Sequence, residues 1–206
     1  MTVEMKPMVT PVPVEELRPT QMTVGYREVE LKRREIRNLT DKKAGSFLGH
    51  HFIPAVVGPK GRYHIVDHHH LARALHEEGI KDILITVIAD LSALKKEPFM
   101  VFMDNRAWLH TFDAAGKKRD YSDLPKMVKD LADDPYRSLA GEVRRQGGYA
   151  KNNVPFSEFM WADYFRHIIP ASEAEHDFDK AMKQALKLAK AEEANFLPGW
   201  CGPQED

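Results

Sequence analysis

The sequence predicts an α/β protein in which a small mixed-sheet core is followed by a mostly helical C-terminal half. Between residues 53 and 89, short runs rich in Val and Ile alternate with one amphipathic segment, which gives the order strand, strand, helix, strand. Beyond residue 95, apolar residues recur at the spacing of helices. We therefore expect an α/β core over residues 1–95 and a mainly helical lobe over residues 96–206 that packs on it.

The first segment is expected to be an extended lead-in over residues 1–13, because three prolines stand in it. Charged residues interrupted by apolar ones at helical intervals then predict an amphipathic helix over residues 26–39. A second, short helical piece is expected over residues 40–48.

A β-hairpin is expected next, over residues 53–57 and 63–66. The intervening Gly58-Pro59-Lys60-Gly61 combines the residues that most strongly favour a turn. The two apolar runs are short enough to be adjacent strands of the core sheet.

A helix follows the hairpin directly and leads into a third strand. Asp67 is a good N-cap for a helix over residues 68–78, and Gly79 is a good residue to end it. Residues 83–89 are strongly β-branched and predict the next strand.

The back half contains apolar residues at helical spacing, with one strand-like run among them. Asp133-Asp134-Pro135 is a favourable helix start, since acidic residues precede a proline at the first helical position. The pattern predicts a strand over residues 109–113 and helices over residues 98–108, 123–131, 133–145, 155–169 and 178–195.

Charge and composition limit the classes of partner. Lys and Arg total 30, Asp and Glu total 31, and the net charge is −1. A nucleic-acid partner is therefore possible but not favoured by charge. The single cysteine excludes an internal disulfide. No stretch resembles a signal peptide or a membrane span, so we expect a cytoplasmic protein with no membrane partner. The oligomeric state cannot be read from the sequence.

Asp67-His68-His69-His70 is the segment most suited to chemistry, because it stands at a strand-to-helix junction. The first turn of a helix presents unpaired N–H groups and the positive end of the dipole, where an anion binds readily. Imidazoles add donors, and their protonation near pH 6.5 adds charge. Asp67 could cap the helix, hold Mg²⁺ or accept a proton. Arg73 lies one turn beyond His69 and could reach a phosphate.

Two other interpretations of the segment stay open. A metal site made from these residues alone is disfavoured, since adjacent helical side chains point about 100° apart and cannot converge on one ion. His50, His51 and His64 could supply further ligands. Alternatively, Asp67 is only a cap and the histidines are surface residues.

Arg137 is a second candidate for anion binding. With Arg144 it would lie on one face of a helix, two turns away, and could face the histidine segment from the second lobe. The simpler interpretation is that Asp133 to Ser138 only starts that helix.

Several segments carry a resemblance to known proteins. The runs Phe52-Ile-Pro-Ala-Val-Val57 and Tyr63-His-Ile-Val-Asp-His-His-His-Leu-Ala-Arg-Ala-Leu75 resemble the core of the ParB/sulfiredoxin superfamily. The chain is most similar to the ParB-like nuclease group of uncharacterised proteins, over nearly its whole length. The segments that carry this similarity are Leu17–Gly25, Asp133–Ser138, Gly147–Tyr149 and Leu197–Gly199.

The resemblance implies a ParB/sulfiredoxin-like fold and work on phosphate groups. In that superfamily some ParB proteins hydrolyse CTP, sulfiredoxin uses ATP, and one branch resembles free-serine kinases. By the same resemblance, Gln21 lies near the mouth of the active site, and ATP or ADP with Mg²⁺ are the expected cofactors. This chain departs from its relatives. With Leu71 as the anchor, Asp67 stands in place of a glycine and His70 in place of an arginine; with a shift of one residue, His68 replaces the glycine. Gln21 stands nearest to the glutamate base of the kinase branch, for which Glu16 or Glu28 could substitute, and Cys201 is far from the position of sulfiredoxin's cysteine.

These observations predict a phosphate-handling enzyme that transfers a phosphoryl group from a nucleotide to a small molecule. Asp67, His68, His69 and His70 are the candidate catalytic residues, with Asp67 also the candidate metal ligand. Gln21, Arg73 and Arg137 are the candidate nucleotide-binding residues. A metal-dependent phosphodiesterase or nuclease, and a non-catalytic nucleotide or metabolite-binding protein, remain as alternatives.

Overall fold

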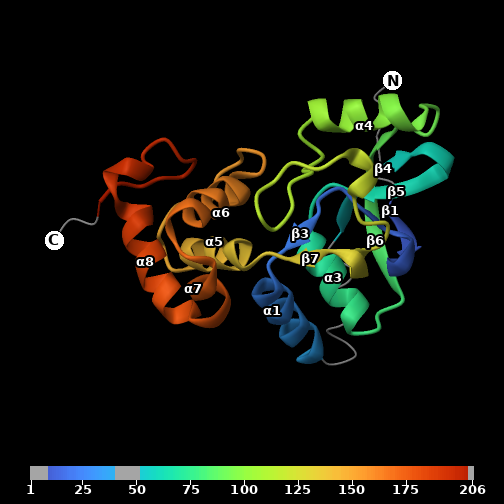
Figure 1. Cartoon of the computed structure of the whole chain (residues 1–206). Helices are drawn as coiled ribbons and strands as arrows, with labels where there is room; N and C mark the ends of the chain where they lie inside the picture. Colours follow the sequence, from blue (N-terminus) through green and yellow to red (C-terminus); the bar gives the residue numbers. More distant parts are fainter. Residues whose placement is uncertain (1–8, 40–51, 204–206) are drawn as a thin grey trace, which may run out of the picture.

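The computed structural model describes residues 9–39 and 52–203 (Figure 1). Its main sheet has five strands in the order β1-β6-β4-β5-β2, with a mixture of parallel and antiparallel pairs. This arrangement confirms the predicted mixed α/β core. The strands are β1 (Val9–Pro13), β2 (Arg18–Pro19), β4 (Ile53–Gly58), β5 (Arg62–Ile65) and β6 (Asp82–Asp90).

The predicted lead-in is in part a strand, which corrects the expectation for residues 1–13. β1 pairs antiparallel with β6 at the edge of the sheet. Pro11 and Pro13 are tolerated there because an edge strand needs only one row of backbone hydrogen bonds, and proline lacks the N–H. The helix expected over residues 40–48, and His50 and His51, lie outside the described residues.

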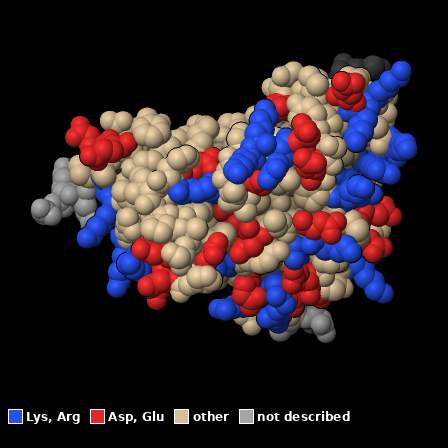
Figure 2. Space-filling view, in the orientation of Figure 1, with Lys and Arg blue, Asp and Glu red and all other residues tan. Residues whose placement is uncertain are grey.

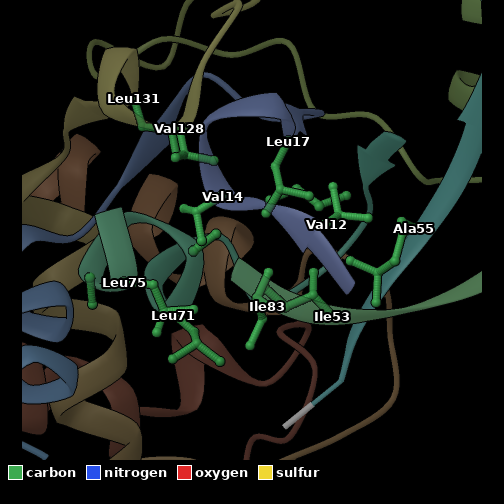
Figure 3. Close-up of a cluster of buried hydrophobic side chains, with 14 of the residues drawn as sticks. Val12, Val14, Leu17, Ile53, Ala55, Leu71, Leu75, Ile83, Val128 and Leu131 are labelled. Carbon is green, nitrogen blue, oxygen red and sulfur yellow. The ribbon is translucent and has the colours of Figure 1, made fainter. Parts of the chain in front are cut away.

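One face of the sheet is covered by α3 (His69–Glu77), with α1 (Tyr26–Arg37) beside it (Figure 1). Leu71 and Leu75 of α3 are buried against Ile53 and Ile83 of the sheet (Figure 3). The period of two along the strands and of about 3.6 along the helix brings these apolar side chains onto facing surfaces. This cluster fixes the position where α3 begins.

The opposite face of the sheet is covered by α4 (Lys96–Asn105). Val56 of β4 points to this side and packs with Phe99 and Met103. The predicted helix over residues 98–108 is therefore confirmed in its centre. Leu109 packs in the same cluster, but residues 109–113 make only isolated bridges rather than the predicted strand.

The helix expected over residues 123–131 is wrong. Short 3₁₀ turns stand at Tyr121–Asp123 and Val128–Asp130, and β7 (Ala132–Asp133) pairs in parallel with β3 (Thr23–Val24). Pro125 cannot continue a helical hydrogen-bond ladder. Val128 and Leu131 instead insert into the hydrophobic core of the sheet domain (Figure 3).

The remaining helices gather at the other end of the molecule around a second core that includes Tyr149, Trp161 and Phe165 (Figure 1). The boundary expected near residue 95 stays a prediction, and the two cores divide further along the chain, between Leu131 and Tyr136. The helices are α5 (Pro135–Arg145), α6 (Ser157–Ile168), α7 (Ala171–His176) and α8 (Phe178–Lys190). A 3₁₀ turn, Glu192–Ala194, follows α8.

Over the described residues, no helix combines the length and apolar character that crossing a membrane requires. The cytoplasmic location stays a prediction.

Candidate functional site

The start of α3 differs from the expectation in its first residue. The predicted N-cap was Asp67, but the helix begins at His69, and His68 occupies the N-cap position in the left-handed conformation with φ 62°. Asp67 is exposed, and its Oδ1 accepts a hydrogen bond from the His68 backbone N–H at 2.6 Å. This contact leaves the other carboxylate oxygen of Asp67 available to a ligand.

His69 and His70 point back into the protein and tie α3 to the segment before α1. The Nε2 atom of His69 accepts the Thr20 N–H at 3.1 Å, and that of His70 accepts the Gly25 N–H at 3.0 Å. A neutral imidazole that accepts at Nε2 carries its proton on Nδ1. These two hydrogen bonds fix the backbone of Thr20 and Gly25 beside the N-terminus of α3.

Burial keeps both imidazoles neutral. The pKa of His69, which is only 3% exposed, falls from 6.5 to about 3 because burial disfavours the charged ring and because His68 and Arg137 are close. The pKa of His70 is also lowered well below 6.5, mainly by burial and next by the charge of Arg137. The expectation that these rings add positive charge near pH 6.5 is therefore wrong for His69 and His70.

A cavity of about 500 Å³ opens at this point, between α3 and the helical lobe. The first residues of α3 line one side of the cavity and those of α6 line the other, so two helix N-termini border the same space. Each helix N-terminus contributes partial positive charge. The lining residues that carry the argument below are Gln21, Asp67, His69, Arg137, Arg144 and Glu158.

Arg137 is the most unusual residue of this cavity. It is 6% exposed, and its Nη2 donates to Glu158 Oε2 at 2.9 Å. Its Nε and Nη1 are buried and have no hydrogen-bond partner among the described residues. The guanidinium carbon lies 4.3 Å from the centre of the Phe159 ring, which supports its flat face. Unsatisfied buried donors are costly, so Arg137 is a candidate to bind a ligand in the cavity that it lines.

Glu158 also contacts Arg144, whose Nε lies 2.9 Å from Glu158 Oε1. The two arginines lower the pKa of Glu158, although burial acts in the opposite direction, so the carboxylate is ionised. The helix position explains the arrangement, since Arg137 and Arg144 are two turns apart on one face of α5 and Glu158 is the second residue of α6.

The structure brings five of the predicted site residues to the cavity and leaves two elsewhere. His68 is exposed and does not line it. Arg73 also does not line it, because its guanidinium donates to Glu77 and to the backbone oxygens of Lys129 and Leu131. The five residues at the cavity are Gln21, Asp67, His69, His70 and Arg137.

Gln21 is held at the cavity by its own backbone contacts. Its side-chain nitrogen donates to the Thr23 carbonyl at 2.7 Å, and the side chain is 7% exposed. An amide oriented in this way keeps its oxygen for a ligand group.

Sequence reasoning missed Glu158 and the exposed rim formed by residues 151–155. Glu158 stands in an ordinary amphipathic helix start, and no local pattern distinguishes it from a solvated acidic residue. Only the approach of α6 to α5 gives it two arginine partners.

The described residues contain no group of three His, Cys, Asp or Glu side chains that could hold a metal ion by themselves. Asp67 is nevertheless suited to Mg²⁺, because this ion often takes one or two protein carboxylates and completes its shell with phosphates and water. Glu158, engaged by two arginines, is not suited.

Comparison with known proteins identifies a matching family and two similar solved structures. Residues 10–167 match the family described as "Putative ParB-like nuclease". The crystal structure of protein Atu1540 from Agrobacterium tumefaciens is 48% identical, with a TM-score of 0.91, and covers 97% of this chain and 100% of its own. The C-terminally truncated chromosome-partitioning protein ParB from Caulobacter crescentus, complexed with CTP-gamma-S, is 14% identical, with a TM-score of 0.34 over 90% of this chain and 93% of its own. No curated protein matches the chain.

Proposed function

The chain belongs to the ParB-like nuclease family, and from that premise we propose that its cavity binds the phosphates of a nucleotide and transfers a phosphoryl group to a small molecule. The observation that carries this proposal is the buried guanidinium of Arg137, two of whose donors have no partner within residues 9–39 and 52–203, in a cavity bordered by the N-termini of α3 and α6. Buried donors and helix N-termini together are complementary to phosphate oxygens.

The charges of the cavity favour an anion. Arg137, Arg144 and Lys151 are positive, Asp67 and Glu158 are negative, and the two lining histidines are neutral, which leaves a surplus of one positive charge. Partial burial strengthens the interaction with a bound anion relative to bulk water.

Each lining group has a distinct proposed role. The first-turn N–H groups of α3 hold phosphate oxygens, and Arg137 stabilises negative charge as it shifts during transfer. His69 and His70 fix the N-terminus of α3, since their Nε2 atoms already accept the backbone N–H groups of Thr20 and Gly25. Asp67 would hold Mg²⁺, which neutralises phosphate charge when bound, or accept the proton of the acceptor hydroxyl.

A metal-dependent phosphodiesterase or nuclease is the second candidate, and the family description favours it. On the face drawn in Figure 2, Lys and Arg side chains gather along the upper right edge and are mixed with Asp and Glu side chains elsewhere. The net charge of the chain is −1, which gives no overall attraction to a polyanion. A nuclease needs a longer positive path to follow the nucleic-acid backbone. The preference for small-molecule phosphoryl transfer rests on the balanced charge of the chain, with 30 Lys and Arg against 31 Asp and Glu.

The proposal is tested by measuring thermal stabilisation by ATP, ADP and CTP with and without Mg²⁺. We expect at least one nucleotide to raise the melting temperature, Arg137→Gln to weaken binding about tenfold or more, and Asp67→Asn to remove the Mg²⁺-dependent part. Arg145→Gln is the control, since Arg145 lies on the same helix but pairs with Glu28 and Glu142 away from the cavity.

The reaction is then followed by phosphorus NMR with a mixture of small hydroxyl compounds and, separately, with single- and double-stranded DNA. Transfer to a small molecule supports the proposal. Cleavage of DNA by the wild-type chain, with a loss of cleavage in Asp67→Asn, would establish the nuclease instead. Nucleotide binding without turnover would indicate the non-catalytic alternative, and absence of any nucleotide binding would reject the phosphate site.

A further inference from the structure

Glu158 joins two arginines at the side of the cavity formed by the helical lobe. Its Oε2 accepts from Arg137 Nη2, and its Oε1 lies 2.9 Å from Arg144 Nε. Arg137 is almost fully enclosed, while Arg144 and Glu158 are partly exposed. Two cations brought together on α5 would repel each other, and the shared carboxylate offsets that repulsion.

The carboxylate does not satisfy the two arginines. Arg137 Nε and Nη1 have no partner among the described residues. Arg144 Nε is close to Glu158 but is not aligned for a hydrogen bond, and it is also buried. Two guanidinium groups and one carboxylate leave a surplus of one positive charge with several N–H donors still available. One further singly charged oxyanion would complete this cluster.

The cluster offers its donors at two points along α5. Arg137 lines the cavity together with His69 and His70, at the start of α3. Arg144 also lines the cavity, but it stands two helical turns, or about 10 Å, further along α5. The donors of Arg144 are therefore presented at a different point of the cavity from those of Arg137.

We propose that Arg144 and Glu158 form a second anion subsite beside the phosphate position at α3, with Arg137 shared between the two, and that this subsite binds a carboxylate or phosphate group of the acceptor. This inference rests on the proposed function and adds that the acceptor is itself an acidic small molecule. With the nucleotide phosphate on Arg137, a neutral acceptor would still leave the buried Nε donor of Arg144 without a hydrogen-bond partner among the described residues, which is costly. The guanidinium geometry suits carboxylate and phosphate oxygens equally.

The first test asks whether a second anion binds when the α3 position is occupied. The full chain is saturated with ADP and Mg²⁺ and then titrated with acetate or with methyl phosphate, while the Nε–Hε signals of arginine are followed by NMR. We expect saturable changes with at least one probe, and the stronger probe identifies the preferred oxyanion. If ADP binds but neither probe does, the second subsite is rejected and the proposed function stands.

Substitution of Arg144 separates the two positions. Arg144→Gln is expected to weaken the second anion about tenfold or more while ADP affinity changes less than about twofold. Arg145→Gln, the neighbouring control, should change neither value. Equal loss of both ligands in Arg144→Gln would mean one continuous site and would overturn the proposal. If ATP, ADP and CTP all fail to bind the wild-type chain, the proposed function itself is rejected, and if only ATP or CTP binds, that nucleotide replaces ADP in both tests.

Glu158→Gln distinguishes a subsite from a purely structural ion pair. Removal of the carboxylate raises the surplus charge from one to two, so methyl phosphate is expected to bind about tenfold more tightly, with a steeper dependence on salt. A structural role predicts lower thermal stability with no gain in affinity. That result, or weaker binding, would contradict the proposal, and Arg144→Gln provides an independent test if Glu158→Gln does not fold.

Discussion

Acidification is expected to destabilise the protein through His69, whose ring is buried and neutral. Its pKa is about 3 in the folded chain, against about 6.5 when exposed, because burial disfavours the imidazolium. A histidine with a lowered pKa binds fewer protons when folded than when unfolded. Its contribution to stability is therefore complete above pH 6.5 and is lost as the pH falls toward 3.

The size of the effect follows from these pKa values. At pH 5, the medium is about 1.5 pH units below the pKa of an exposed histidine, and each unit corresponds to about 1.36 kcal/mol. At pH 5 the unfolded chain takes up a proton on His69 and the folded chain does not. The free energy of unfolding is therefore about 2 kcal/mol lower at pH 5 than at pH 7. This is a large fraction of the 5–15 kcal/mol that typically stabilises a domain of ordinary size.

Urea unfolding at pH 7 and pH 5 measures this contribution in wild type and in His69→Gln. The glutamine oxygen can still accept the Thr20 N–H, but it does not titrate, so the variant should lose about 2 kcal/mol less than wild type between the two pH values. His68→Asn is the control, because His68 is exposed and asparagine tolerates its left-handed backbone. Equal losses in wild type and His69→Gln would refute the assignment of His69 as a buried neutral acceptor.

Two further substitutions test how the lobes are held. Asp134→Ala is expected to cost about 2–4 kcal/mol in urea unfolding, since Asp134 is 1% exposed, caps α5 and pairs with Arg166 at 2.5 Å, which would keep only its second carboxylate partner, Asp163. A cost below about 1 kcal/mol would show that the pair is not needed. Gly25→Ala is expected to cost about 1–3 kcal/mol, because the new Cβ would lie 2.6 Å from the Ser138 backbone nitrogen. Gly141→Ala, where the nearest atom outside α5 is a flexible glutamate oxygen at 3.3 Å, is the matched control, and equal stability of the two variants would contradict the close contact at Gly25.

The central unit of the fold could be predicted because its signals are local. Apolar runs on either side of Gly58 to Gly61 defined the hairpin, and Gly79 adopts the positive φ of 69° that a helix end requires. Asp134 caps α5 as the acidic residues before Pro135 indicated. Each of these features depends on residues within one turn of one another.

The region around residues 121–133 could not be predicted, because its structure depends on distant partners. The apolar residues Val128 and Leu131 gave a helical pattern, but they are buried in the core of the sheet domain. Ala132 pairs with Thr23, more than a hundred residues earlier in the chain. A periodic pattern records which residues are buried, not which element buries them.

For the candidate site, the sequence by itself determined which residues have the chemistry and which helices begin with them. Five of the seven predicted residues line one cavity. The tertiary structure alone decided their roles: His69 and His70 became neutral acceptors of backbone N–H groups, and Arg73 was taken by backbone oxygens. The approach of α6 to α5 also places Glu158 against Arg137 and Arg144. Burial and pairing depend on how elements approach one another, and that information is not contained in the spacing of residues along a single element.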